Sequence, residues 1–210
     1  VRLSREDRHL TVFRGHADAK WALEASLDRV RQFSSNAERE KFQNDLIDDF
    51  KRESRLVSGH IDTNRTENGW LYLARHHGLP TPVLDWSDSP YVAAFFAFAT
   101  QVPKASHVAI WSLNRDVFLN ADVDIDIDDS PIEIGNNSRA VSQRGLFMHI
   151  KANKTHPESV INDGLERWTI PSKCRSEALN DLDEMGINDR NLLMNLDSAA
   201  RTVCVRAGLA

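Results

Sequence analysis

The chain has 210 residues, of which 41% are hydrophobic and 27% are charged, so it can bury the core of one ordinary globular domain. We therefore expect a single domain over residues 1–210. The formal net charge of −5 argues against binding nucleic acid through a general attraction to phosphate, although a local basic patch is still compatible with it. Cys174 and Cys204 lie far apart without metal-ligand spacing, which predicts reduced thiols. With no signal peptide, membrane span or lipidation motif visible, we expect a cytoplasmic protein without a membrane partner.

A strand is the first element that the sequence predicts. Residues 9–13, HLTVF, alternate polar and apolar side chains and predict a strand that ends at Arg14 and Gly15. The arginine would then point into a cleft, and the glycine would let the backbone approach a ligand closely. Further along, residues 37–57 carry apolar side chains near helical spacing with charges between them, which predicts an amphipathic helix.

A turn in the middle of the chain gives the strongest local signals. Residues 70–77 predict a short helix that ends at Gly78 and cannot continue through Pro80. Val83 and Leu84 then carry the chain into the core, so the polar residues that follow them are placed beside buried structure.

A second helix follows this turn. Ser89 offers a side-chain oxygen to free amides, and Pro90 needs no donor in the first helical turn. The helix that they predict, residues 91–100, has no polar face and is too short to cross a bilayer. We expect it to be buried all round, with the core built around it.

The second half of the chain predicts further strands and one helix. The acidic run at 120–131 resembles a calcium loop only loosely, because it lacks the required glycine and terminal glutamate, so we interpret it as a solvated edge or loop. The remaining predictions are a buried central strand at 107–113, a possible strand at 131–135, strands at 145–150 and 166–171, and a helix at 172–186 capped by Ser172 and ended by Gly186. Together these elements predict an α+β fold with a small split or mixed β-sheet around the 91–100 helix.

Common catalytic motifs are absent: no Walker loop, GxGxxG, HExxH, GxSxG or CxxC pair occurs. What remains is a set of ambiguous residues. Arg14 is either a phosphate-binding fork or a surface arginine, and Asp85 either orients another side chain or serves as a cap or ion-pair partner. His76 and His77 are candidate metal ligands or acid/base groups, but adjacent histidines at a helix end point in different directions, so we expect no metal site.

Three segments considered together are more specific. FRGHADAKWALEASLDR, ARHHGLPTPVLDWSDSPYVAAFFA and SRAVSQRGLF resemble the FRG domain family, which is named for its Phe-Arg-Gly motif. Two positions depart from the pattern: Arg75 stands where the family commonly has glutamine, and Pro82 where it commonly has arginine. The residues that carry the resemblance include Phe13, Arg14, Gly15, Trp21, Leu23, Arg29, His77, Gly78, Pro80, Thr81, Leu84, Asp85, Trp86, Ser87, Pro90, Phe95, Phe96, Arg139, Gln143, Gly145 and Phe147.

The order of the FRG motifs is similar to that of ADP-ribosyltransferases, and this similarity implies roles for particular residues. Arg14 would hold the phosphate or ribose of NAD, and the Gly15 backbone would hold the nicotinamide amide. Such enzymes usually carry a glutamate that steadies the transition state, and here Gln143 or Glu133 would replace it. The remaining residues expected to bind NAD are His77, Asp85, Trp86 and Ser87.

The resemblance therefore implies an NAD-dependent ADP-ribosyltransferase that acts on a macromolecular target, either protein or nucleic acid. FRG proteins resemble toxin or phage-defence effectors, so a neutralising antitoxin protein is an expected partner. NAD would be a substrate, and no metal is expected. One alternative is a non-catalytic module that binds a nucleotide or nucleic acid in the same cleft, and another is a nuclease-like toxin that uses His76 or His77.

Overall fold

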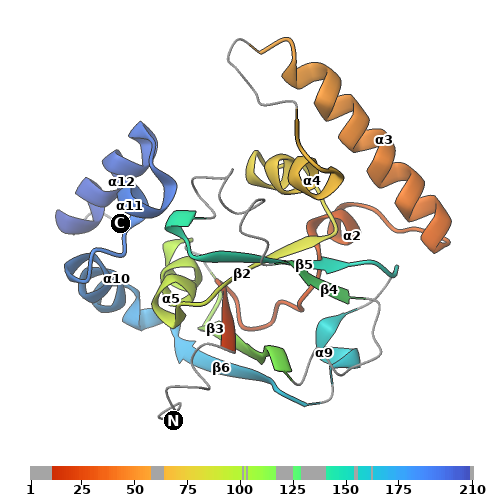
Figure 1. Cartoon of the computed structure of the whole chain (residues 1–210). Coiled ribbons are helices and arrows are strands. Elements are labelled where there is room, and N and C mark those ends of the chain that lie inside the picture. The colour runs from red at the N-terminus through yellow and green to blue at the C-terminus, as the bar shows by residue number, and fades with distance from the viewer. Residues whose placement is uncertain are drawn as a thin grey trace.

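Six antiparallel strands form one sheet in the computed structural model, in the order β4-β5-β2-β1-β3-β6 (Figure 1). The structure describes residues 11–57, 64–100, 102, 104–116, 125–128, 141–153, 156–161 and 163–208. The strands are β1 (Thr11–His16), β2 (Val83–Ser87), β3 (His107–Asn114), β4 (Ile125–Asp128), β5 (Gly145–Ile150) and β6 (Leu165–Pro171).

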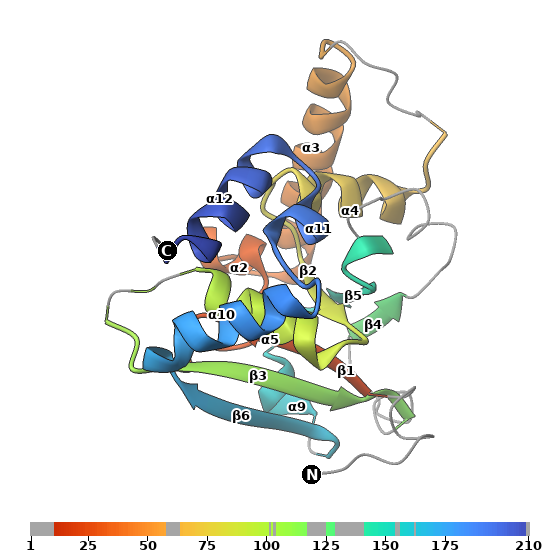
Figure 2. The same cartoon turned by 90° about the vertical axis from the view of Figure 1, so that its left-hand side faces the viewer.

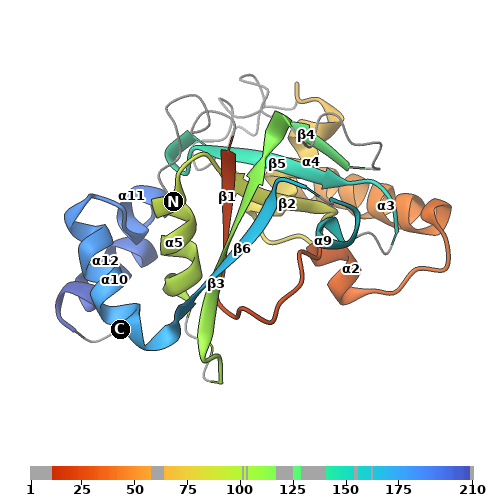
Figure 3. The same ribbon diagram turned by 90° about the horizontal axis from the view of Figure 1, so that it is seen from below.

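Helices lie on both sides of this sheet. Within the described residues they are α2 (Ser26–Val30), α3 (Asn36–Ser54), α4 (Glu67–His76), α5 (Pro90–Ala99), α9 (Pro157–Val160), α10 (Arg175–Glu184), α11 (Asp189–Leu193) and α12 (Leu196–Arg206), with a 3-10 helix, η1 (Ser172–Cys174), before α10. Figures 2 and 3 show α10, α11 and α12 gathered outside α5, at the end of the molecule opposite α2, α3 and α9.

The two faces of the sheet carry different hydrophobic clusters. On one face a single cluster runs across the sheet and includes Val12 of β1 and Trp86 of β2. Because side chains alternate along a strand, their neighbours point to the opposite face. There Phe13 packs with α5 and α10, whereas Val83 packs with α4 and Phe147. That face is therefore divided between two helical layers, one over β1 and one over β2.

The division coincides with a weak seam in the sheet. β1 and β3 pair over six residues, but β1 and β2 pair only at Phe13 and Ser87. The next pair in register would join Gly15 to Asp85, and it does not form among the paired residues of these strands. The expected α+β class is confirmed. The expectation of a mixed sheet is wrong, because every pairing among the described strands is antiparallel. Alternation of side chains along a strand reveals its two faces but not the direction of its neighbours.

Helix α5 starts as the sequence predicts. The Ser89 side chain accepts a hydrogen bond from the Val92 amide, and Pro90 occupies the first turn. The prediction that this helix is buried all round is wrong on one side and at its ends: Tyr91 is 54% exposed, Thr100 is exposed, and Ala94, Phe96 and Ala99 are only half-buried. The buried residues of the helix, Val92, Ala93, Phe95, Ala97 and Phe98, pack with residues of β1, β3 and α10.

Several predicted boundaries need correction. The strand expected to end at Arg14 and Gly15 extends to His16, since β3 continues to pair with it through Ala109. Ser172 does not cap a helix; its hydroxyl donates to the Ala105 carbonyl at 2.7 Å, and a 3-10 turn separates it from α10. The strand expected at 131–135 lies outside the described residues.

Other elements are confirmed with small shifts. The helix predicted at 70–77 is α4, with Thr66 as its cap and Gly78 beyond its end at a φ of +88°. The helix predicted at 37–57 is α3. The strands at 107–113, 145–150 and 166–171 are β3, β5 and β6, and part of the acidic run forms the edge strand β4.

The contact between α5 and β1 predicts the effect of one substitution. A Cβ atom on Gly15 would lie 2.0 Å from the Ala93 carbonyl oxygen and 2.6 Å from the Ala97 nitrogen, both of which are backbone atoms that cannot turn away. We expect Gly15→Ala to lower the free energy of unfolding by about 3 kcal/mol or more, at the upper end of overpacking costs. Urea denaturation measures the loss.

Gly78→Ala is the matched control for that substitution. Its φ of +88° strains any L side chain, but nothing lies within 4 Å of the added Cβ. Its cost should stay near roughly 1 kcal/mol. Equal losses in the two variants would show that α5 can move away from β1.

Candidate functional site

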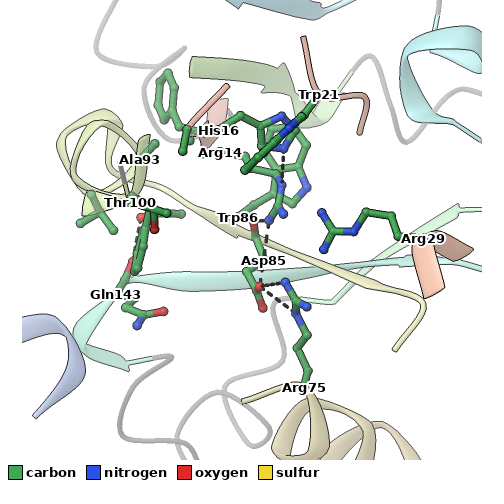
Figure 4. A pocket seen from close by; sticks show the side chains of 16 residues that line it. Arg14, His16, Trp21, Arg29, Arg75, Asp85, Trp86, Ala93, Thr100 and Gln143 are labelled. Atoms are coloured by element: carbon green, nitrogen blue, oxygen red, sulfur yellow. Dashed lines mark hydrogen bonds and ion pairs between the residues drawn. The ribbon is translucent and has the colours of Figure 1, made fainter. Parts of the chain in front are cut away.

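A cavity of about 310 Å³ lies at the seam where β1 and β2 part (Figure 4). Its wall includes side chains from both faces of the sheet, such as Arg14 and Trp86 from one and Asp85 from the other. Two strands joined by a full ladder could not expose both faces to one cavity. The lining residues are Phe13, Arg14, Gly15, His16, Ala17, Trp21, Arg29, Arg75, Asp85, Trp86, Ser87, Val92, Ala93, Phe96, Thr100 and Gln143.

Most residues that the sequence singled out meet in this cavity. Six of them line it: Arg14, Gly15, Asp85, Trp86, Ser87 and Gln143. His77 does not, because it is the exposed residue that ends α4. Glu133 lies outside the described residues, as does Arg139.

Arg14 forms part of the cavity wall and is held on two sides. Its Nε donates to His16 Nε2 at 3.1 Å, and its Nη1 donates to the Asp85 carbonyl oxygen at 2.6 Å. Only 12% of the side chain is exposed. Burial lowers the pKa of Arg14 to about 10, with Asp85 opposing this shift, so the guanidinium stays charged at neutral pH. Arg14 therefore bridges the seam that the backbone leaves open.

His16 is a neutral residue behind Arg14. Burial, reinforced by the charge of Arg14, lowers its pKa to about 3. Arg14 has no acceptor atom, so His16 Nε2 accepts and the ring proton sits on Nδ1. Trp111 Nε1 lies 3.3 Å from Nδ1 as a second potential donor, but a protonated Nδ1 cannot accept from it. A hydrogen bond with the Trp21 backbone opposes the downward shift of the His16 pKa.

Asp85 connects β2 to α4 and α2. Arg75 donates to Asp85 Oδ2 from Nε at 3.0 Å and from Nη2 at 2.8 Å, while its Nη1 donates to the Ser26 hydroxyl at 3.1 Å. The Asp85 side chain is 43% exposed and Arg75 only 19%. The carboxylate thus faces the cavity with one oxygen already bound.

Gly15 and Ser87 have structural roles that could not be predicted from the sequence. Gly15 was expected to offer its backbone to a ligand; the structure shows that α5 occupies the space above it. Ser87 is 5% exposed, and its hydroxyl donates to the Gln143 carbonyl at 2.7 Å and accepts from the Ser89 amide at 3.1 Å. Ser87 therefore fixes the turn that starts α5 against residue 143.

Gln143 reaches the cavity but is partly engaged elsewhere. Its Nε2 donates to the Leu192 carbonyl at 3.2 Å, which ties the side chain to α11. Among the described residues, no partner contacts its Oε1 by a hydrogen bond, so this acceptor is the atom left for a ligand. An acceptor can bind a ribose hydroxyl, but it carries no full negative charge.

Aromatic side chains supply the apolar walls. Trp21 is 42% exposed at the cavity, and Phe96 lines it from α5. Trp86 is 3% exposed, and its buried indole N–H has no hydrogen-bond partner within the described part of the chain. A neighbouring cavity of about 320 Å³ shares Arg75, Asp85, Trp86, Phe96 and Gln143 with the first. The two cavities are therefore lobes of one cleft.

The lining residues that the sequence analysis did not propose for the site include His16, Trp21, Arg29 and Arg75. Arg75 was noted only as a departure from the family pattern, and Trp21 and Arg29 only as matches to it. A cluster of aromatic and basic residues within 13–29 was the available signal, but no spacing rule shows that such residues face one cavity. His76, by contrast, lines the neighbouring cavity and not the first.

The charges of the cavity wall are unequal. Among the described lining residues, Arg14, Arg29 and Arg75 oppose the single carboxylate of Asp85, which gives these side chains a formal charge of +2. This excess occurs in a chain whose net charge is −5. The local balance favours an anionic ligand.

The described residues contain no group of three or more His, Cys, Asp or Glu side chains that could hold a metal ion. None of the helices they form has the length and apolar content needed to cross a membrane.

The fold and the cavity define an α+β protein with a basic, aromatic-lined cleft. Residues 9–106 match the model of the FRG domain family. The match covers just under half of the chain, and it supports the resemblance for the part that carries Arg14, Arg29, Arg75 and Asp85. No curated protein and no solved structure matches the chain significantly.

The buried neutral state of His16 predicts a pH dependence. Its folded pKa of about 3 lies below the unfolded value of 6.5, so the unfolded chain takes up a proton first as the pH falls. Stability is then lost as the pH falls from 6.5 towards 3, by roughly 2 kcal/mol at pH 5 from this group. His16→Gln, whose amide oxygen can still accept from Arg14, should show a smaller loss between pH 7 and pH 5.

Denaturant unfolding at the two pH values measures this difference. Some dependence should remain in the variant, since burial also lowers the pKa of His149. A variant that loses as much stability as the original chain would show that His16 titrates freely.

The half-burial of Phe96 separates it from its neighbour Phe95. Phe95 is 2% exposed in the core under α10, so Phe95→Ala should cost about 3–5 kcal/mol. Phe96 lines the cleft, and Phe96→Ala should cost less than half as much. Thermal and urea unfolding of both variants check this order, and a larger loss at Phe96 would contradict it.

Proposed function

We propose that this protein is an NAD-dependent ADP-ribosyltransferase. The single observation that carries the proposal is the convergence of the Phe-Arg-Gly strand, the Asp-Trp-Ser strand and Gln143 on one cavity at a parted seam. A basic cleft with aromatic walls and two lobes suits a dinucleotide, which has two base-ribose halves joined by a diphosphate.

In this reaction the bond between ribose C1′ and the nicotinamide nitrogen breaks, and its electron pair leaves with nicotinamide. Positive charge develops on the ribose ring, a nucleophile of the target forms the new bond to C1′, and that nucleophile loses its proton. The expected target is a protein or a nucleic acid, as for a toxin or phage-defence effector. An antitoxin protein would then bind this protein and neutralise its activity.

Each kind of side chain in the cleft suits one part of the dinucleotide. The arginines attract the diphosphate, and Trp21 offers an exposed ring on which a base can stack. Gln143 Oε1 can accept from a ribose hydroxyl. Asp85 is the only carboxylate among the described lining residues, so it is the candidate to stabilise the developing positive charge.

A non-catalytic nucleotide-binding module is the second candidate function. One observation favours it: Arg75 already occupies Asp85 Oδ2, and Leu192 already holds the Gln143 amide. A cleft whose polar groups are engaged in this way can bind a nucleotide without turning it over.

To test the proposal, the purified protein is incubated with cell extract and with NAD labelled in the adenylate half. The transfer of label to macromolecules is measured, and NAD binding to the purified protein is measured separately. Transfer supports the enzyme, binding without transfer supports the module, and the absence of both overturns the two proposals.

Asp85→Asn keeps an acceptor for Arg75 but removes the charge, so it should slow transfer at least tenfold, about 1.4 kcal/mol in the barrier.

Asp88→Asn is the matched control for this substitution. Asp88 pairs with Arg144 beside the same turn, and it lines neither cavity. Its transfer rate should equal that of the original chain. Equal rates for both variants would remove Asp85 from the reaction, and thermal melts establish that each variant is folded.

A further inference from the structure

We propose that Arg29, and not Arg14, is the residue that binds the diphosphate of the ligand. The inference rests on the proposed function for the identity of that ligand, a dinucleotide or ADP-ribose. It assigns to Arg29 the phosphate contact that the sequence resemblance implies for Arg14.

The three arginines of the cavity differ in how fully they are engaged. Arg14 uses Nε and Nη1 within the protein, and Arg75 uses all three of its side-chain nitrogens on Asp85 and Ser26. Arg29 lines the same cavity, but its guanidinium makes no hydrogen bond or ion pair with the residues that the structure describes. A planar fork with unused donors is the group that binds a phosphate through two parallel hydrogen bonds.

Arg29 also has the right position. Figure 4 shows its side chain extending from α2 towards Arg14 and Trp86, on the side of the cavity opposite α5. Arg29 and Arg75 both contribute to lowering the pKa of Arg14, so their charges lie within interaction range of it. An anion in contact with Arg29 would therefore face the full positive charge of the wall.

The backbone that carries Arg29 is held rigidly by its neighbour in the chain. Asp28 is bound by both arms of Arg39, with Nε to Oδ1 at 2.6 Å and Nη2 to Oδ2 at 2.8 Å. Arg39 is 2% exposed and also donates to the Lys151 carbonyl at 3.1 Å. At the start of the helix, Ser26 and Leu27 both donate to the Thr81 carbonyl.

This anchoring explains why a five-residue helix can serve as a fixed platform. A short helix has little stability of its own, so its position depends on tertiary contacts. Here those contacts immobilise Asp28 and leave the next side chain free to meet a ligand. Such pre-organisation reduces the ordering cost of binding.

The test measures the Kd of ADP-ribose by calorimetry, at several salt concentrations, for the full chain and for three variants. Arg29→Gln should raise the Kd at least tenfold and make it less dependent on salt, since one charge contact with phosphate is lost. Arg29→Lys should recover part of the affinity, because it keeps the charge but not the fork.

Arg31→Gln is the matched control. Arg31 lies two residues further on, pairs with Glu38 at 3.0 Å and does not line the cavity, so its substitution should leave the Kd unchanged. A merely structural role for Arg29 would change the Kd without changing its salt dependence, and that result overturns the proposal. So does a Kd for Arg29→Gln equal to that of the original chain, or no ADP-ribose binding by the original chain.

Failure of this inference can be told apart from failure of the proposed function. If ADP-ribose binding depends on Arg29 but NAD gives no transfer, the anion site stands and the transferase does not. If transfer occurs and its KM for NAD is the same in Arg29→Gln, the transferase stands and the assignment of Arg29 fails.

Discussion

The direct contact of α5 with the backbone of β1 at Gly15 is the constraint on which the rest of the structure depends. No side chain larger than hydrogen fits between the strand and the helix, so the two backbones touch. The contact brings Ala93 and Phe96 up to the seam, where they form one wall of the cavity. The glycine of the Phe-Arg-Gly motif is thus required for packing, and through packing it shapes the site.

The seam itself is closed by side chains in place of a backbone ladder. Arg14 donates across it to the Asp85 carbonyl, and Asp85 in turn accepts from Arg75. These bonds connect β1, β2 and α4, and Ser26 extends the network to α2. Strands held in this way keep fixed positions although their backbones pair only at Phe13 and Ser87, which a continuous ladder does not allow.

Much of the fold and part of the site could be predicted from the sequence, and the limits have physical reasons. Ser89, Pro90 and Gly78 mark helix ends through local bonding, so α4 and α5 were predicted within a few residues. Six proposed site residues share the cavity because they sit near the parted seam. His77 does not line the cleft, because consecutive residues of a helix point about 100° apart. His76 faces the neighbouring cavity, and His77 is exposed to solvent. Direction and partner choice in the sheet depend on distant contacts, which no local pattern encodes.

Charge explains why the missed residues matter. Arg14 loses part of its hydration on burial, and the neighbouring cations Arg75 and Arg29 add repulsion, which the attraction of Asp85 opposes. His16 stays neutral beside it and therefore adds no further positive charge. The wall consequently carries more positive charge than its own carboxylate can balance. Repulsion of this kind works against the folded chain, and an anion that enters the cavity relieves it, so part of the binding free energy is already stored in the arrangement of the arginines.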